Sequence, residues 1–164
     1  MFYSRCQRSA YFDPVPDLGR MIVFIDGENI VFRFQAMLKK GAEKREGIKH
    51  IEDIFVWHTN SVDPRFNIVL KAIYYTTVVG DTPKIEEIAK TIKASSFKQY
   101  SPEDIPLSKR LPNRLTPVIF KKGKNQRNTK GLDIQMTVDI LTNIYQNNID
   151  VVYLVQETGI MFRL

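Results

Sequence analysis

Cysteine is nearly absent from this sequence, since Cys6 is the only one among 164 residues. A single thiol excludes an intrachain disulfide and a cysteine-based zinc site. Histidine is almost as scarce, and His50 and His58 do not make a metal site by themselves. Each histidine is interpreted as a surface or helix-flanking residue. Small disulfide-stapled domains and zinc fingers are therefore excluded.

Long apolar runs are also missing. No run approaches the roughly 20 residues that a helix needs to span a bilayer. Residues 1–20 contain arginines but no apolar stretch of the kind a signal peptide requires. We therefore expect a cytoplasmic protein without membrane contact. Pro14, Pro16 and Gly19 predict an irregular N-terminal extension over residues 1–20, followed by a single domain over 21–164.

Acidic residues are missing from one strongly basic segment of a chain whose net charge is +6. Such a segment suits contact with nucleic-acid phosphates, and a solvated loop with ordinary lysines is the alternative. The segment runs from residue 109 to residue 130 and contains no Asp or Glu. Its eight basic residues are Lys109, Arg110, Arg114, Lys121, Lys122, Lys124, Arg127 and Lys130.

Apolar strands alternate with helical patterns along the rest of the chain. The uninterrupted run at 21–25 predicts a strand buried on both faces. Alternating elements imply βαβ units and an α/β fold with a mostly parallel central sheet and flanking helices. Ligands bind such sheets beyond the carboxyl ends of the strands. Further strands are expected at 68–79, 117–120 and 151–155, helices at 29–40, from Pro83 onward and at 132–146, and a loop at 100–117.

Asp26 is the first candidate site residue, because it comes directly after the apolar strand. Glu28 and Asn29 follow within one helical turn. Clustered oxygen ligands are what a hard cation such as Mg²⁺ requires. Alternatively, Asp26 caps the following helix, which is a common use of Asp. Both interpretations remain open.

Asp133 is the second candidate. On a helical wheel of residues 132–145 it falls inside the apolar arc, between Ile140 and Ile144. A carboxylate on the core side of a helix is costly unless it is paired or binds a metal. The alternative is a first-turn acid that interacts with the helix dipole. Asp139 falls on the polar arc, which favours a solvated acid.

Three segments carry a resemblance to a known family. FIDGEN after an apolar strand, KGLDIQMTVDI at the start of a helix, and IDVVYLV resemble the NYN branch of the PIN-like ribonucleases in order and spacing. The resemblance runs from about Met21 to Val155. It implies a PIN-like, Rossmannoid three-layer fold. It also implies carboxylates that hold Mg²⁺ or Mn²⁺ and a metal-activated water that cuts RNA phosphodiester bonds.

The resemblance also implies roles for particular residues. Asp26 and Asp133 would be metal ligands, and Asn29 would orient Asp26 or contact the substrate. Asp139 matches a frequent catalytic acid of the family. The partner would be single-stranded or structured RNA, and a homodimer is left open. The alternatives to a nuclease are a non-catalytic RNA-binding module and a protein-interaction module. The RNA backbone would be held by Lys121, Lys122, Lys124, Arg127 and Lys130.

The C-terminal tail departs from the family pattern. Family members continue after the last strand with a segment like SGDGD, whose first Asp completes the metal cage. Here QETGIMFRL follows Val155, so Thr158 takes that position and Glu157 comes one residue early. Deletion of one nucleotide from a gene encoding SGDGDYVPL reproduces this tail with suitable codons. We therefore expect a nuclease domain truncated by frameshift, with weakened or absent activity, and the nucleotide sequence tests this.

Overall fold

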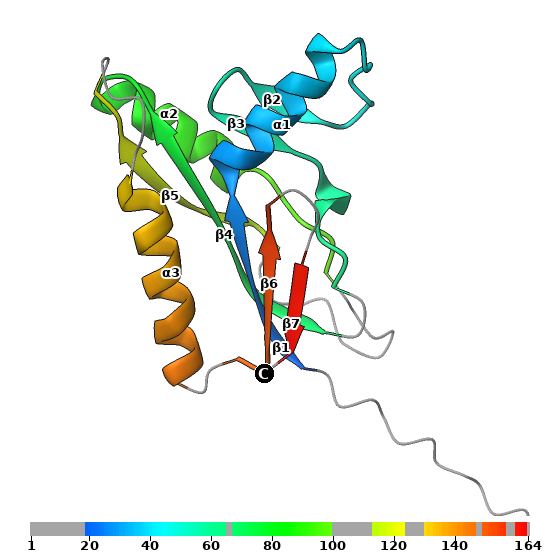
Figure 1. Ribbon diagram of the computed structural model, residues 1–164, viewed down its shortest axis with the longest axis vertical. Helices are drawn as coiled ribbons and strands as arrows, with labels where there is room; N and C mark the ends of the chain where they lie inside the picture. The colour runs from blue at the N-terminus through cyan, green and yellow to red at the C-terminus, as the bar shows by residue number, and fades with distance from the viewer. Residues whose placement is uncertain are drawn as a thin grey trace, which may run out of the picture.

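A computed structural model describes residues 19–64, 67–99, 113–123, 130–146, 149–156 and 160–163. Its centre is a five-stranded sheet of order β5-β4-β1-β6-β7, and a separate hairpin pairs β2 with β3 (Figure 1). The elements are β1 (Arg20–Asp26), α1 (Gly27–Lys39), β2 (Lys49–Ile51), β3 (Phe55–Trp57), the short 3-10 helix η1 (Thr59–Ser61), β4 (Ile68–Val78), α2 (Thr82–Lys93), β5 (Leu115–Lys121), α3 (Lys130–Tyr145), β6 (Val151–Val155) and β7 (Ile160–Arg163).

The sheet is mostly parallel, as the alternation of strands and helices predicted. β1 pairs in parallel with β4 on one side and β6 on the other, and β4 pairs in parallel with β5. Only β7 runs antiparallel, along the outer edge of β6. The apolar residues of β1 are all buried, which explains why the sequence shows no alternation there.

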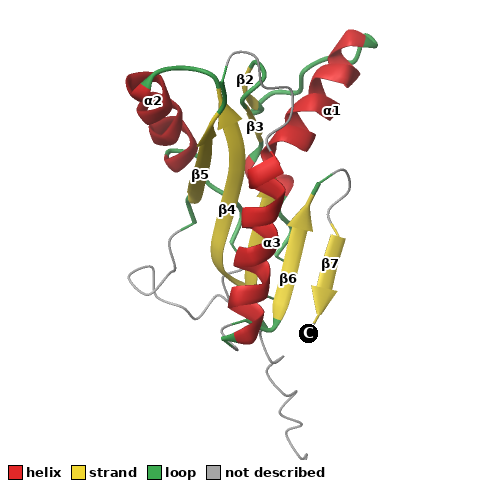
Figure 2. Cartoon of the chain, turned by 60° about the vertical axis from the view of Figure 1, so that its left-hand side comes forward, coloured by secondary structure: helices red, strands yellow, loops and turns green. Residues whose placement is uncertain are grey.

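Two apolar clusters, one on each face of the sheet, make a three-layer structure. Met21, Val23 and Ile25 belong to the cluster that includes residues of α2 and the β2–β3 hairpin. Ile22 and Phe24 belong to the cluster that includes residues of α3. Figure 2 shows α3 running along the front of the sheet, with α1 and α2 near its upper end. Ile30 of α1 and Ile88 of α2 pack in the first cluster, so these helices cover the opposite face. The predicted α/β fold with helices on both faces is confirmed.

Most predicted element boundaries agree with the structure, with corrections at the ends. The strand predicted at 151–155 has those bounds, and the strand predicted at 117–120 is longer, at 115–121. Residue 20 is part of β1, so the irregular segment predicted to reach it is too long. The predicted loop at 100–117 is wrong at its end, where β5 begins, and 100–112 lie outside the described residues.

Three strands, β2, β3 and β7, were not predicted from the sequence. The first two have three residues each, too few for a period-two pattern to stand out. β7 lies in the tail that was interpreted as a frameshifted segment. Among the helices that the structure describes, none is long and apolar enough to cross a membrane.

Candidate functional site

The candidate residues come together at one edge of the sheet. β1, β4 and β5 end there, and α1 and α3 begin there (Figure 1). Asp26 is the last residue of β1, Lys121 is the last residue of β5, and Asp133 lies in the first turn of α3. The topology therefore joins segments that lie about a hundred residues apart in the chain.

Asp26 is buried, with 8% of its surface exposed, and it caps α1. Its Oδ1 accepts a hydrogen bond of 3.0 Å from the backbone N–H of Asn29. The capping interpretation is therefore confirmed. Capping does not compete with metal binding, because it engages Oδ1 and a carboxylate has a second oxygen. The bond comes from the backbone of Asn29, and the roles predicted for this residue, orienting Asp26 or contacting substrate, stay predictions.

Gly27 explains the close approach of α1 to the sheet. A Cβ atom at this position would lie 2.5 Å from the carbonyl oxygen of Tyr75 and 2.7 Å from Cζ of Tyr74. Only glycine fits at such a distance from a neighbouring backbone. The glycine in DGEN thus lets α1 begin directly against β4, which places Asp26 and Glu28 over the strand ends.

Burial and neighbouring acidic residues raise the pKa of Asp26. Burial is the largest cause of the increase, and the charges of Asp133 and Glu28 add to it, while the hydrogen bond from Asn29 opposes it. A bound cation would stabilise the charged form of Asp26, which burial and the neighbouring acids disfavour. Mg²⁺ is usually held by one or two carboxylates together with water and substrate phosphates, so Asp26 and Asp133 suit it chemically. Within the described ranges, however, no three acidic, histidine or cysteine residues form a metal-binding group.

Asp133 does not face the core, so the helical-wheel prediction for it is wrong. Its side chain is exposed at the start of α3. The wheel was centred on all the apolar residues of this helix, but several of them are on the outside, including Ile134 at 63% and Val138 at 48% exposure. The most buried residues of α3 are Leu132 and Met136, which define the side that contacts the sheet.

Asp139 lies on the sheet side of α3, which corrects the prediction of a solvated acid. It is half-buried, and its Oδ2 accepts a hydrogen bond of 2.6 Å from the hydroxyl of Tyr75 on β4. Its Oδ1 accepts one of 2.8 Å from Nε2 of Gln135. Six residues of helix place Asp139 about 9 Å along the axis from Asp133. Asp139 therefore links α3 to β4 through Tyr75, the residue of β4 that pairs with Asp26.

We predict that Tyr75→Phe lowers the free energy of unfolding by about 1–2 kcal/mol, because it removes a hydrogen bond to a half-buried carboxylate. Urea denaturation measures this change. Tyr145→Phe is the matched control, since Tyr145 is 85% exposed and should tolerate loss of its hydroxyl. Equal stability of the two variants would show that the Tyr75–Asp139 contact does not anchor α3.

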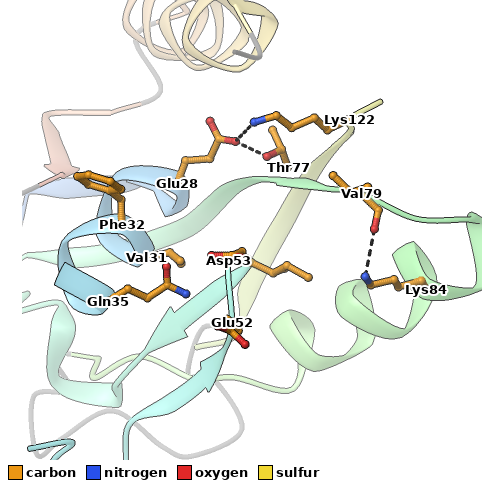
Figure 3. A pocket seen from close by; sticks show the side chains of 11 residues that line it. Glu28, Val31, Phe32, Gln35, Glu52, Asp53, Thr77, Val79, Lys84 and Lys122 are labelled. Carbon is orange, nitrogen blue, oxygen red and sulfur yellow. Dashed lines mark hydrogen bonds and ion pairs between the residues drawn. The ribbon is translucent and has the colours of Figure 1, made fainter. Parts of the chain in front are cut away.

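Glu28 connects three elements at the strand ends. Its Oε1 accepts a hydrogen bond from the hydroxyl of Thr77 near the end of β4. The same oxygen lies 3.9 Å from Nζ of Lys122, just beyond β5 (Figure 3). From the sequence, Glu28 was predicted only to be an oxygen-bearing neighbour of Asp26. Its position two residues after a strand-end Asp, in the first turn of a helix, was the available signal.

The basic residues predicted to hold RNA are only partly described. Lys121 is exposed at the end of β5, and Lys122 is half-buried beside Glu28. Lys124 and Arg127 lie outside the described residues, and for Lys130 the structure describes only the backbone at the start of α3.

Four further residues, the two histidines and two residues of the tail, were considered as candidates. His58 caps η1, since its Nδ1 accepts a hydrogen bond from the backbone N–H of Asn60. His50 lies in β2 and contacts the ring of Phe34 edge-on. The structure gives neither histidine a place among the strand-end carboxylates. Glu157 and Thr158 lie outside the described residues.

A comparison with protein families decides the class of this domain. The model of the NYN domain matches residues 20–163. The chain belongs to the NYN family. The resemblance inferred from FIDGEN and KGLDIQMTVDI is therefore confirmed, and the NYN match extends through β7. An NYN domain is a PIN-like, nuclease-related and RNA-related domain, and the three-layer sheet agrees with that fold. No curated protein and no solved structure matches the chain.

Proposed function

We propose that this NYN domain binds RNA across the carboxyl ends of β1, β4 and β5 and hydrolyses its phosphodiester bonds with Mg²⁺ or Mn²⁺. The observation that carries the proposal is the buried Asp26 beside the charges of Asp133 and Glu28. A buried carboxylate whose pKa is raised by desolvation and by specific neighbouring charges is typical of functional sites. Membership of the NYN family supports the same chemistry and substrate.

The residues have separate roles in this proposal. Asp26 and Asp133 would hold the ion, which when bound lowers the pKa of a water molecule and stabilises charge on the phosphate. The backbone of Asn29 fixes the orientation of Asp26. Asp139 acts as a positioning residue, because its contact with Tyr75 keeps α3 and hence Asp133 in place.

We also propose that cleavage by this chain is slow. Thr158 stands where the family pattern has an acidic ligand, and a neutral hydroxyl compensates less of the charge of a divalent cation than a carboxylate. If cleavage is absent, the domain would be a non-catalytic RNA-binding module. A protein-interaction module without RNA binding is the remaining alternative. RNA binding separates the last alternative from the other two.

We predict that the chain binds single-stranded RNA with an affinity that falls as salt rises, because phosphate contacts release counterions. Replacing Lys121, Lys124 and Arg127 by Gln should reduce the slope of log K against log salt by about 2, since each lost contact contributes about 0.7. Lys122 is left unchanged because it lies beside Glu28. Binding curves at several salt concentrations measure the slope.

Three exposed lysines at the C-terminal end of α1 and in the loop after it provide the control for this experiment. Replacing Lys39, Lys40 and Lys44 by Gln removes the same charge away from the strand ends and should leave the slope nearly unchanged. Equal effects of the two triple variants on the slope would show that residues 121–127 contribute only to the net charge and make no particular contact with RNA. Absence of salt-dependent RNA binding in the unmodified chain would contradict the proposed function itself.

A further inference from the structure

A cavity of about 540 Å³ opens beside the carboxylates, between α1, the β2–β3 turn and α2 (Figure 3). Neither Asp26 nor Asp133 lines it, but Glu28, Thr77 and Lys122 do. Because Glu28 comes two residues after Asp26, the cavity adjoins the proposed cleavage site and is separate from it. Its volume lies within the range of small-molecule binding pockets.

The α1 wall of the cavity offers an aromatic ring and an amide. Phe32 lines it although 70% of the residue is exposed, and Gln35 lines it one helical turn further on. Residues three apart lie on the same side of a helix. An exposed aromatic ring gains stabilisation by stacking on the face of a nucleobase, whichever base it is. A side-chain amide can bond both donors and acceptors of a base edge.

The β2–β3 turn presents hydrogen-bond acceptors to the same cavity. Glu52 and Asp53 line it from this turn, and the backbone of Asp53 has a φ of 59°. Asp is one of the few non-glycine residues that adopt this left-handed conformation readily. Carboxylates repel phosphate but accept hydrogen bonds from the amino groups of bases. This wall therefore suits a base edge and disfavours a backbone phosphate.

Two lysines supply positive charge to the remaining walls. Lys84 comes from the first turn of α2, and its Nζ donates a hydrogen bond of 3.1 Å to the carbonyl oxygen of Val79. Lys122 comes from the end of β5. The cavity thus combines an aromatic ring, base-edge acceptors and cations. This combination suits a nucleotide, because the base can stack on the ring and form hydrogen bonds while the phosphate pairs with a lysine.

We propose that this cavity takes one unpaired nucleobase of the RNA strand whose backbone lies over Asp26, with the base stacked on Phe32. The adjoining phosphate faces Lys84 and Lys122. This proposal rests on the proposed function, because it requires RNA at the strand ends. It adds a contact with a base to contacts that otherwise involve only the backbone. RNA that is fully base-paired cannot place a base in the cavity without unpairing it.

The test measures binding of a short single-stranded oligoadenosine RNA in EDTA, which prevents metal-dependent cleavage. Phe32→Ala should weaken binding by about tenfold or more, the effect of losing one base–aromatic stack. It should leave the salt slope unchanged, because no phosphate contact is lost. Phe32→Tyr keeps the ring and should bind like the unmodified chain. Thermal denaturation checks that each variant folds, which the exposure of Phe32 favours.

Two controls make the result specific. Tyr145→Ala removes another exposed aromatic ring, at the far end of α3, and should not weaken binding. Inorganic polyphosphate carries charge without bases, so Phe32→Ala should bind it as the unmodified chain does. If Phe32→Ala binds RNA like Tyr145→Ala, or loses polyphosphate binding equally, the base pocket is wrong. If the unmodified chain shows no salt-dependent RNA binding, the proposed function fails instead.

Discussion

Asp26→Asn is expected to reduce Mg²⁺-dependent cleavage of single-stranded RNA by at least about 100-fold. A metal-bound water and a metal-stabilised phosphate together contribute several kcal/mol to catalysis, and each 1.36 kcal/mol is about tenfold in rate. Asn offers a neutral oxygen in place of the charged one, so it binds the cation more weakly. Asp133→Asn should cause a comparable loss, since the two residues would share the ion.

Although Asp26→Asn should lower the rate of cleavage, it should not lower the stability of the fold. Burial raises the pKa of Asp26, so the folded state binds its proton more tightly than the unfolded chain does. The stability of the unmodified, metal-free protein therefore falls as pH rises through this raised pKa, whereas Asn cannot ionise and escapes this loss. The Asn oxygen still accepts the hydrogen bond from the backbone of Asn29. Melting curves in EDTA from acidic to neutral pH should show the variant equal to or more stable than the parent at neutral pH.

A loss of cleavage without a loss of stability separates a catalytic role from a structural one. The measurements are made in the chain itself and in a Thr158→Asp version, which restores the acidic residue of the family pattern and should cleave faster. Asp139→Asn should reduce cleavage less, because Asp139 contacts Tyr75 and Gln135 and would not touch the ion. If Asp139→Asn is more damaging than Asp133→Asn, the wrong carboxylate of α3 has been assigned to the metal.

The sequence predicted the fold and the edge of the sheet where the candidate residues meet, because both follow from local patterns. β1 is buried on both faces, so its residues form an unbroken apolar run. Asp26 follows that run directly, and parallel strands end at a common edge. An apolar strand followed by a polar residue and a helix thus predicts both the sheet and the edge at which Asp26 lies.

The orientation of α3 depends on packing that no local pattern encodes. Ile134, Val138 and Leu141 are apolar yet exposed, so a wheel that assigns every apolar residue to the core turns the helix the wrong way. The hydrogen bond from Tyr75 to Asp139 crosses more than sixty residues of sequence. A pairing of this kind becomes visible only when β4 and α3 are placed together.

The cavity beside Glu28 was missed for the same reason. Its lining comes from segments between residue 28 and residue 122, and part of it comes from a hairpin whose strands have three residues each. In the sequence, nothing distinguishes Phe32 from the other apolar residues of this helix. Its 70% exposure, known only from the structure, is what gives it a candidate role.

Gly27→Ala is expected to lower the free energy of unfolding by about 2–3 kcal/mol, the upper part of the range for overpacking. The added methyl group would meet the ring of Tyr74 and the backbone carbonyl of Tyr75 at distances that real Cβ atoms essentially never show. Neither neighbour moves easily. Tyr74 is fully buried, and its hydroxyl accepts a hydrogen bond of 3.2 Å from the backbone N–H of Val56. Tyr75 belongs to β4, which is paired on both sides.

Gly131→Ala is the matched control for this prediction, because its added Cβ would lie 3.7 Å from the ring of Phe120, an ordinary contact. Alanine is a better helix former than glycine by about 1 kcal/mol, so this variant should be as stable as the parent or more stable. Chemical denaturation of both variants measures the difference. The clash at Gly27 also pushes α1 away from β4, so Asp26 and Glu28 should shift relative to Asp133 and RNA cleavage should fall together with stability. If Gly27→Ala is as stable as Gly131→Ala, the start of α1 can move without cost, and the close approach of α1 to β4 does not fix the position of Asp26.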